Sequence, residues 1–214
     1  MPATAILVPI ESGALAGDLT LPDGATGLVL FAHGSGSSRH SPRNQLVARA
    51  LEQHGLGTLL IDLLTPDEDA IDRRTAGLRF DIGLLAGRLV RMIDWLGSDP
   101  RTATLRVGLF GASTGGGAAL AAAADRPARV ATVVSRGGRP DLANGSLPRV
   151  QAPTLLIVGG QDAAVIQMNE SAMRRMQAPV TLRLVPGASH LFEEPGALEA
   201  VSALAAEWFG KYLT

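Results

Sequence analysis

The sequence predicts an α/β protein whose mostly parallel sheet is covered by helices on both faces. After two initial strands, short β-branched or Leu-rich runs alternate with longer segments of helical periodicity. Residues 27–32 form the apolar run GLVLFA, which lacks polar alternation, as expected of a central strand buried on both faces. The chain has 214 residues, and we expect residues 1–214 to form a single domain.

The elements follow from these runs in chain order. We expect eight strands, at residues 4–10, 14–21, 27–32, 57–62, 105–110, 130–135, 153–158 and 180–185. Between and after them we expect helices at residues 42–54, 72–97, 114–125, 163–177 and 196–212. Ser41 followed by Pro42 predicts a helix start, and Gly55 suits the left-handed position that ends the same helix. Residues 136–152, between two successive strands, are too few for a lid domain.

Composition limits the possible partners. Apolar residues make up 46% of the chain and charged residues 18%, which is typical of a globular protein. The net charge of −1 creates no long-range field that would attract nucleic acid or an anionic membrane. The absence of cysteine excludes disulfides and thiolate metal sites. Because we find neither a signal-peptide pattern nor an apolar run of about 18 residues, we expect a cytoplasmic location.

The strongest chemical motif lies at residues 111–115, which read G-A-S-T-G. This G-x-S-x-G pattern follows a predicted strand and opens an Ala-rich predicted helix. A sharp turn from strand to helix needs small neighbours, because the backbone of the central serine is strained and other chains pass close to it. The alternatives are a serine that caps the helix and a phosphate-binding loop, although the G-K-[ST] ending of a Walker loop is missing. We interpret Ser113 as a nucleophile.

A general base and its orienting acid follow later strands. Of the four histidines, only His190 follows the last predicted strand, and Asp162 follows the strand before it. The order Ser, Asp, His is the one expected when each residue lies at the carboxyl edge of a parallel sheet. We therefore predict His190 as the base and Asp162 as the acid that orients it. Asp141 and Asp125 are the fallback acids.

The loop after the strand at 27–32 reads H-G-S-G-S-S and can complete the site. A tetrahedral intermediate needs two N–H donors aimed at its oxygen, and we expect them from the backbone of Ser35 and of Thr114. The alternatives are a flexible Gly/Ser loop or an anion nest. We expect His33 to be a structural hydrogen-bonding residue beneath this loop rather than a second base.

Four arginines follow strands at the same edge: Arg39, Arg43, Arg136 and Arg139. Arginine can hold a carboxylate or phosphate by two parallel hydrogen bonds, so Arg39 and Arg136 are candidate substrate-binding residues. The alternative, which we favour, is structural pairing with nearby carboxylates; the candidates are Asp62, Asp67, Asp81 and Asp141.

Four motifs together resemble the α/β-hydrolase superfamily: residues 33–36 (HGSG), 111–115 (GASTG), 160–162 (GQD) and 187–192 (GASHLF). The chain is similar in particular to the dienelactone hydrolase-like branch. Within it, the chain resembles bacterial hydrolase domains found alone or fused to phosphoribosyltransferases, on the stretches at residues 63–68 (LLTPDE), 78–83 (LRFDIG) and 134–141 (VSRGGRPD). The resemblance implies an α/β-hydrolase fold without a lid domain and an ester-type acyl transfer. Dienelactone hydrolases proper carry a cysteine at the position of Ser113, so turnover of dienelactones does not carry over.

The residues and the resemblance together predict a serine hydrolase that cleaves small carboxylic esters or lactones through an acyl-enzyme. No metal and no organic cofactor is implied, and the expected partner is a small-molecule ester. An acyltransferase, a thioesterase or a perhydrolase with the same three residues is an alternative, and so is a non-catalytic binding domain. The sequence does not predict the oligomeric state.

Overall fold

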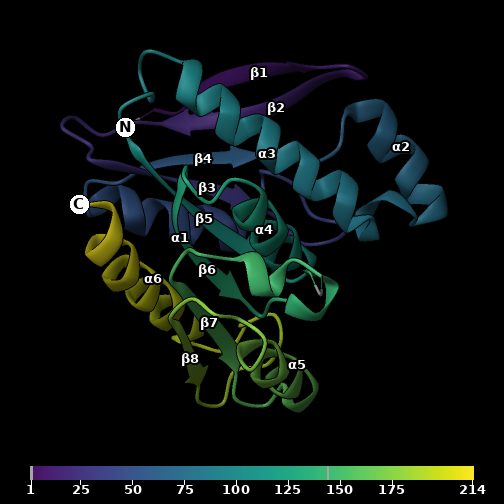
Figure 1. Cartoon of the computed structure of the whole chain (residues 1–214), viewed down its shortest axis with the longest axis vertical. Helices are drawn as coiled ribbons and strands as arrows, with labels where there is room; N and C mark the ends of the chain where they lie inside the picture. The colour runs from purple at the N-terminus through teal and green to yellow at the C-terminus, as the bar shows by residue number, and fades with distance from the viewer. Residues whose placement is uncertain (1, 144) are drawn as a thin grey trace.

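One eight-stranded sheet forms the centre of the molecule. The computed structural model describes residues 2–143 and 145–214, and its sheet has the strand order β1-β2-β4-β3-β5-β6-β7-β8 (Figure 1). Strands β3 to β8 run parallel to one another, whereas β2 is antiparallel to both β1 and β4. The strands are β1 (Thr4–Ile10), β2 (Gly13–Thr20), β3 (Gly27–Ala32), β4 (Gly57–Ile61), β5 (Arg106–Ala112), β6 (Val130–Arg136), β7 (Thr154–Gly159) and β8 (Val180–Val185). The eight-stranded, mostly parallel sheet predicted from the sequence is confirmed.

Helices cover both faces of the sheet, as predicted. On one face lie α3 (Ile82–Ser98), α4 (Thr114–Asp125) and α5 (Ala163–Met173), and on the other lie α1 (Pro42–Gln53) and α6 (Ala197–Leu213) (Figure 1). The acidic helix α2 (Pro66–Thr75) stands out from this layer beyond the end of β4. Short 3₁₀ turns lie at Leu78–Phe80, Pro140–Ala143 and Leu147–Arg149. None of the described helices combines the length and the hydrophobicity that a membrane crossing requires.

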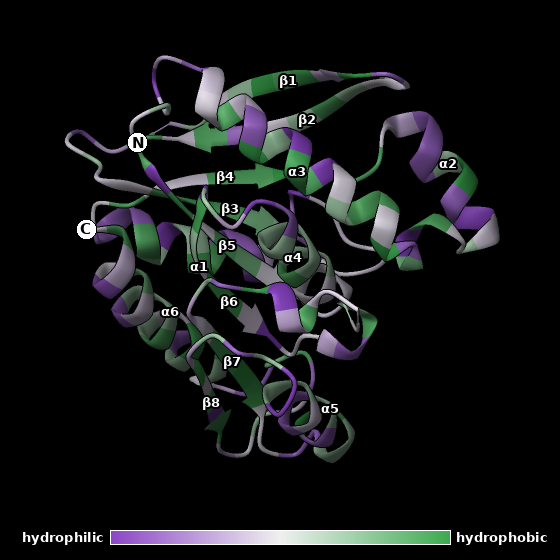
Figure 2. Ribbon diagram, viewed as in Figure 1, coloured by the Kyte–Doolittle hydropathy of each residue, from purple (hydrophilic) through white to green (hydrophobic). Residues whose placement is uncertain are grey.

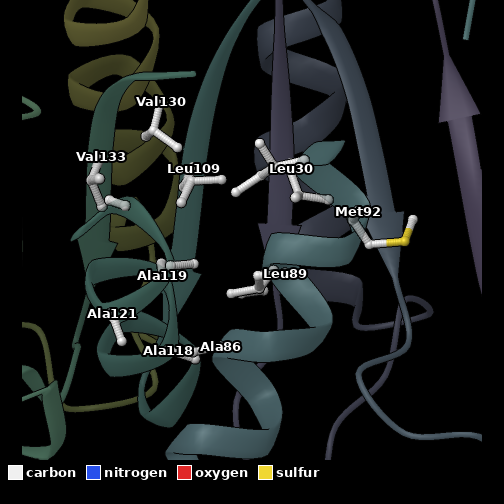
Figure 3. Close-up of a cluster of buried hydrophobic side chains, with 14 of the residues drawn as sticks. Leu30, Ala86, Leu89, Met92, Leu109, Ala118, Ala119, Ala121, Val130 and Val133 are labelled. Carbon is white, nitrogen blue, oxygen red and sulfur yellow. The ribbon is translucent and has the colours of Figure 1, made fainter. Parts of the chain in front are cut away.

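Alternate residues of the central strands build two separate cores. In β3, Leu28 and Leu30 pack towards α3 and α4, whereas Val29 and Phe31 pack towards α1 and α6. Figure 3 shows the first core, where Leu89 of α3 lies beside the strands and the small side chains of α4. Small residues on α4 let this helix lie close to the sheet. Figure 2 shows how hydropathy is distributed over the fold, with apolar residues along the strands and polar ones on the exposed α2.

The helix predicted at residues 72–97 is wrong, because two helices occupy this region. The first, α2, begins earlier, where Thr65 accepts from the N–H of Glu68 and Glu68 accepts from the N–H of Thr65. It ends at Ala76, which adopts a left-handed conformation with φ of 54°. The second, α3, begins after Asp81, whose carboxylate accepts from the N–H of Leu84. Two sets of capping signals therefore override the continuous apolar periodicity.

Candidate active site

Ser113 lies on a sharp turn between β5 and α4. Its backbone has φ of 51° and ψ of −120°, a combination that residues with a side chain rarely adopt. The turn is possible because the residues two positions before and after Ser113 are glycines, which have no side chain. A Cβ on Gly111 would lie 2.5 Å from the carbonyl oxygen of Gly115, and one on Gly115 would lie 2.3 Å from that of Ala32. The Ser113 side chain does not cap α4, so the capping alternative is not what the structure shows.

Backbone hydrogen bonds hold this turn against the end of β6. The N–H of Ser113 donates to the carbonyl of Arg136 at 3.1 Å, and the carbonyl of Ser113 accepts from the N–H of Arg139 at 3.0 Å. Because both bonds tie the turn to one neighbouring segment, the strained conformation is fixed by the surrounding structure rather than by local preference.

The structure brings Ser113, His190 and Asp162 together. Nδ1 of His190 lies 2.7 Å from Oδ2 of Asp162, and Nε2 of His190 lies 3.4 Å from Oγ of Ser113. The Asp162 side chain is only 15% exposed, and its other oxygen accepts from the N–H of Val165 at the start of α5. An ionised Asp162 requires a proton on Nδ1, which leaves Nε2 free to accept a proton from the serine hydroxyl.

The two fallback acids lie elsewhere in ion pairs. Asp141 contacts Arg139, and Asp125 contacts Arg149. The loops that carry His190 and Asp162 are instead bonded to each other, since the N–H of Gln161 donates to the carbonyl of Ala188 at 3.0 Å. This bond fixes the distance between the histidine and its carboxylate.

The loop after β3 closes the other side of Ser113. A Cβ on Gly34 would lie 3.2 Å from the Cβ of Ser113, so the backbone of this loop passes directly over the serine. Thr114 is the first residue of α4, and its N–H has no partner within the helix. Ser35 and Thr114 both line the cavity described below. The structure thus places Thr114 next to the serine and the loop that carries Ser35 against it, and the role of both N–H groups as oxyanion donors stays a prediction.

His33 anchors this loop from beneath. Its Nδ1 donates to the carbonyl of Gly34 at 2.9 Å, and its Nε2 accepts from the N–H of Leu63 at 3.1 Å. Burial lowers the pKa of His33, which outweighs the opposing effect of the Gly34 carbonyl. The imidazole is therefore held neutral and serves as a structural link between the loop and the end of β4, as the sequence analysis expected.

A cavity of about 860 Å³ opens beside Thr114. The loop that follows β3 forms one wall, and the segment from the end of β4 to the 3₁₀ turn after α2 forms the other, including Asp69, Arg73 and Arg79. Arg79 is held by the buried carboxylate of Asp72, with Nε 2.6 Å from Oδ2. This second wall was not predicted from the sequence, although Thr65-Pro66 followed by Glu68 is a typical N-terminal capping pattern of a helix.

The arginines differ in how they are paired. Arg39 lines the cavity and contacts the carboxylates of Asp62 and Asp18, and Arg139 contacts Asp141, as the structural alternative predicted. Arg43 contacts Glu193 at 3.0 Å. Arg136 has no ion pair or hydrogen bond from its side chain to any residue within 2–143 or 145–214. Its role in substrate binding stays a prediction.

The described part of the chain contains no group of three or more His, Cys, Asp or Glu residues arranged to hold a metal ion. The polar groups that converge at the carboxyl edge of the sheet are instead a hydroxyl, an imidazole, a carboxylate and backbone N–H groups.

The fold and this constellation define an α/β hydrolase. Residues 25–212 match the dienelactone hydrolase family, and the chain belongs to this family. The solved structure of dienelactone hydrolase from Anabaena variabilis ATCC 29413 is 63% identical, with a TM-score of 0.97, and the match covers 99% of this chain and 98% of that one.

Two further relatives extend the comparison. A putative phosphoribosyl transferase of Mycobacterium tuberculosis (strain H37Rv) is 57% identical over 199 residues, which are 93% of this chain and 44% of that protein. This chain therefore spans less than half the length of that relative. Est1E from Butyrivibrio proteoclasticus is 15% identical with a TM-score of 0.81, over 97% of this chain and 98% of that one, and shows a shared fold.

Proposed function

We propose that this protein is a serine hydrolase that cleaves carboxylic esters, either small acyl esters or lactones, through an acyl-enzyme. The observation that carries the proposal is the continuous contact from Ser113 through His190 to Asp162, with distances of 3.4 and 2.7 Å. The first distance exceeds that of a tight hydrogen bond, but catalytic contacts are often loose without substrate and shorten when it binds.

The first half of the reaction forms the acyl-enzyme. Nε2 of His190 takes the proton from Oγ of Ser113 as that oxygen bonds to the ester carbonyl carbon. The carbonyl oxygen becomes an oxyanion and accepts from the backbone N–H groups of Ser35 and Thr114. The bond to the leaving oxygen then breaks, and His190 passes its proton to that oxygen. Asp162 stabilises the imidazolium throughout.

The second half returns the free enzyme. His190 takes a proton from water as the water oxygen attacks the acyl carbon, and the same two N–H groups stabilise the new oxyanion. The bond from the carbonyl carbon to Oγ then breaks, and His190 returns the proton to Ser113. The carboxylic acid leaves, and no external oxidant or reductant is consumed.

A fluorophosphonate probe tests the nucleophile directly. We expect it to label the protein at Ser113, as identified by peptide mass spectrometry, and to leave the Ser113→Ala variant unlabelled. The labelled protein should lose its activity towards p-nitrophenyl acetate in proportion to the label. Label on a different residue, or full activity of the Ser113→Ala variant, would overturn the assignment.

Transfer to acceptors other than water uses the same three residues. Acyl transfer, thioester cleavage and perhydrolysis differ only in the nucleophile that deacylates Ser113 or in the leaving atom. Product ratios measured with competing alcohol, thiol and peroxide distinguish them. A binding domain without activity would bind esters yet resist the fluorophosphonate. We retain a small-molecule ester as the expected partner, without nucleic acid or membrane, and a cytoplasmic location as a prediction.

A further inference from the structure

Arg136 is a buried cation at the carboxyl end of β6. It pairs in register with Ala112, the residue before Ser113, and is only 8% exposed. Val134, two residues earlier on the same strand, packs into the core beneath α1 and α6. Arg136 therefore lies on the α1 and α6 side of the sheet, whereas the cavity lined by Thr114 extends towards α2.

The guanidinium of Arg136 lacks a counter-ion among the residues that the structure describes. Its Nη1 is buried without a hydrogen-bond partner, and its Cζ lies over the ring of Phe192, 5.9 Å from the ring centroid. Burying an unpaired charge is unfavourable, so such groups usually have a ligand or a partner. Burial, reinforced by the nearby charge of Arg43, lowers the pKa of Arg136 to about 10, and the group still carries its charge at neutral pH.

A second arginine adds to the positive charge. Arg43, in the first turn of α1, donates through Nη1 to Glu193, while its Nε is buried without a hydrogen-bond partner. Glu193 is largely exposed, with 62% of its side chain accessible, so it screens Arg43 only weakly. The two guanidinium groups repel each other, and an anionic group between them would relieve this repulsion.

This pair of cations adjoins the candidate active site. The carbonyl of Arg136 accepts from the N–H of Ser113. The next residue, Gly137, lies against the histidine, since a Cβ there would be 3.6 Å from Cε1 of His190. Phe192, which stacks on Arg136, belongs to the same loop as His190 and is held at φ of 55°. A substrate whose carbonyl group reacts with Ser113 could thus bind Arg136 through another of its groups.

We propose that Arg136 and Arg43 form a subsite for an oxyanionic group of the substrate, a carboxylate or a phosphate, so that the preferred esters are anionic. The proposal rests on the proposed function. The planar fork of Arg136 supplies two parallel donors that match the two oxygens of such a group. Arg43 adds a donor and a second positive charge. Esters without the anionic group leave both cations uncompensated and should react more slowly.

Matched ester pairs test this subsite. Each pair contains a phenyl ester with a free carboxylate and the same ester with that carboxylate methylated; one pair carries it on the acyl chain and the other on the phenol. We expect wild-type kcat/KM to favour the free carboxylate in one pair or both. The Arg136→Met variant should reduce this preference on the order of tenfold or more, as expected for a lost charged hydrogen bond. Arg136→Lys should be intermediate, because it keeps the charge without the fork.

Two further variants complete the ester comparison. Arg43→Met should reduce the preference more modestly, and it provides an independent test if Arg136→Met folds poorly. Arg49→Met is the matched control, because Arg49 is an exposed residue of the same helix as Arg43. Its preference should equal that of the wild type. Equal preference in wild type, Arg136→Met and Arg43→Met would overturn the subsite.

Thermal unfolding separates this proposal from the proposed function. Millimolar succinate or inorganic phosphate should raise the melting temperature of wild type and of Arg49→Met, but not that of Arg136→Met. Stabilisation by these anions without any esterase activity or fluorophosphonate label would retain an anion site and reject the hydrolase. Stabilisation without a preference for anionic esters would reject a substrate subsite. Esterase activity without stabilisation by anions and without a preference for anionic esters would reject the subsite and retain the hydrolase.

Discussion

The strained backbone of Ser113 should affect the stability of the protein independently of the catalytic role of its hydroxyl. With φ of 51° and ψ of −120°, Ser113 occupies a region that glycine enters without a Cβ clash and other residues enter at a cost. We therefore expect Ser113→Gly to be more stable than Ser113→Ala. Both variants lose the hydroxyl and its contact with His190, so their difference isolates the backbone.

The expected difference follows from two opposing terms. Relief of a backbone held in a sparsely populated region is worth about 1–3 kcal/mol. Glycine loses more backbone freedom than alanine on folding, which costs about 0.5–1 kcal/mol. The balance favours Ser113→Gly by about 1 kcal/mol, which corresponds to about 2–4 °C in melting temperature for a domain of 150–250 residues.

Urea unfolding followed by tryptophan fluorescence measures this difference, since Trp95 and Trp208 are half-buried and report on helices over both faces. Both variants should lose on the order of 10⁶ in kcat, as expected for removal of a serine nucleophile. If Ser113→Gly proved less stable than Ser113→Ala, the turn would not be strained, and the mechanical reason for the surrounding glycines would fail.

The other predictions concern the base, the acid, the packing of the turn and the loop beneath it. His190→Ala should abolish the hydrolysis of p-nitrophenyl acetate, because no other side chain contacts Oγ of Ser113 to accept its proton among the residues that the structure describes. Asp162→Asn should preserve the positions of the side chains in a crystal structure yet lower kcat by up to ~10⁴, because the histidine adopts the wrong tautomer. Gly115→Ala should fail to yield soluble folded protein or unfold far below the wild type in a melting scan, because its Cβ would lie 2.3 Å from the carbonyl oxygen of Ala32. Burial lowers the pKa of His33, so below about pH 6.5 the unfolded chain binds a proton at this residue before the folded chain does. The free energy of unfolding should therefore fall as the pH decreases below this value, by at most about 1.4 kcal/mol per pH unit from this residue. The urea midpoint of His33→Asn should depend less on pH than that of the wild type.

The sheet was predictable because its central strands are buried on both faces. Residues 27–32 carry six apolar or small residues in a row, and such a run admits few alternatives to a central parallel strand. The helix boundary after β4 was not predicted, because α3 has a strong apolar periodicity and its extension towards residue 72 concealed the earlier cap at Thr65. Capping there depends on reciprocal hydrogen bonds, which periodicity does not report.

The positions of the candidate site residues were predictable from topology. Ser113, Asp162 and His190 each follow a parallel strand, and the carboxyl ends of parallel strands share one edge of the sheet. The sequence could not show which arginines would be paired. Arg39 and Arg139 find carboxylates nearby, as favoured, but Arg136 points into a face that offers the ring of Phe192 instead.

Departures from ordinary folding preferences gather at this edge rather than being spread through the molecule. Ser113 and Phe192 are two of the three residues other than glycine that have positive φ within the described ranges, and both lie beside Arg136, the buried cation without a counter-ion. Each departure opposes folding, and the one at Ser113 persists because close glycine contacts and backbone hydrogen bonds to the end of β6 fix the turn. A buried charge without a partner costs free energy of folding, and an apolar side chain of similar length removes that cost. Arg136→Met should therefore melt no lower than the wild type in the absence of anions, and that result would assign the role of this cation to a ligand rather than to folding.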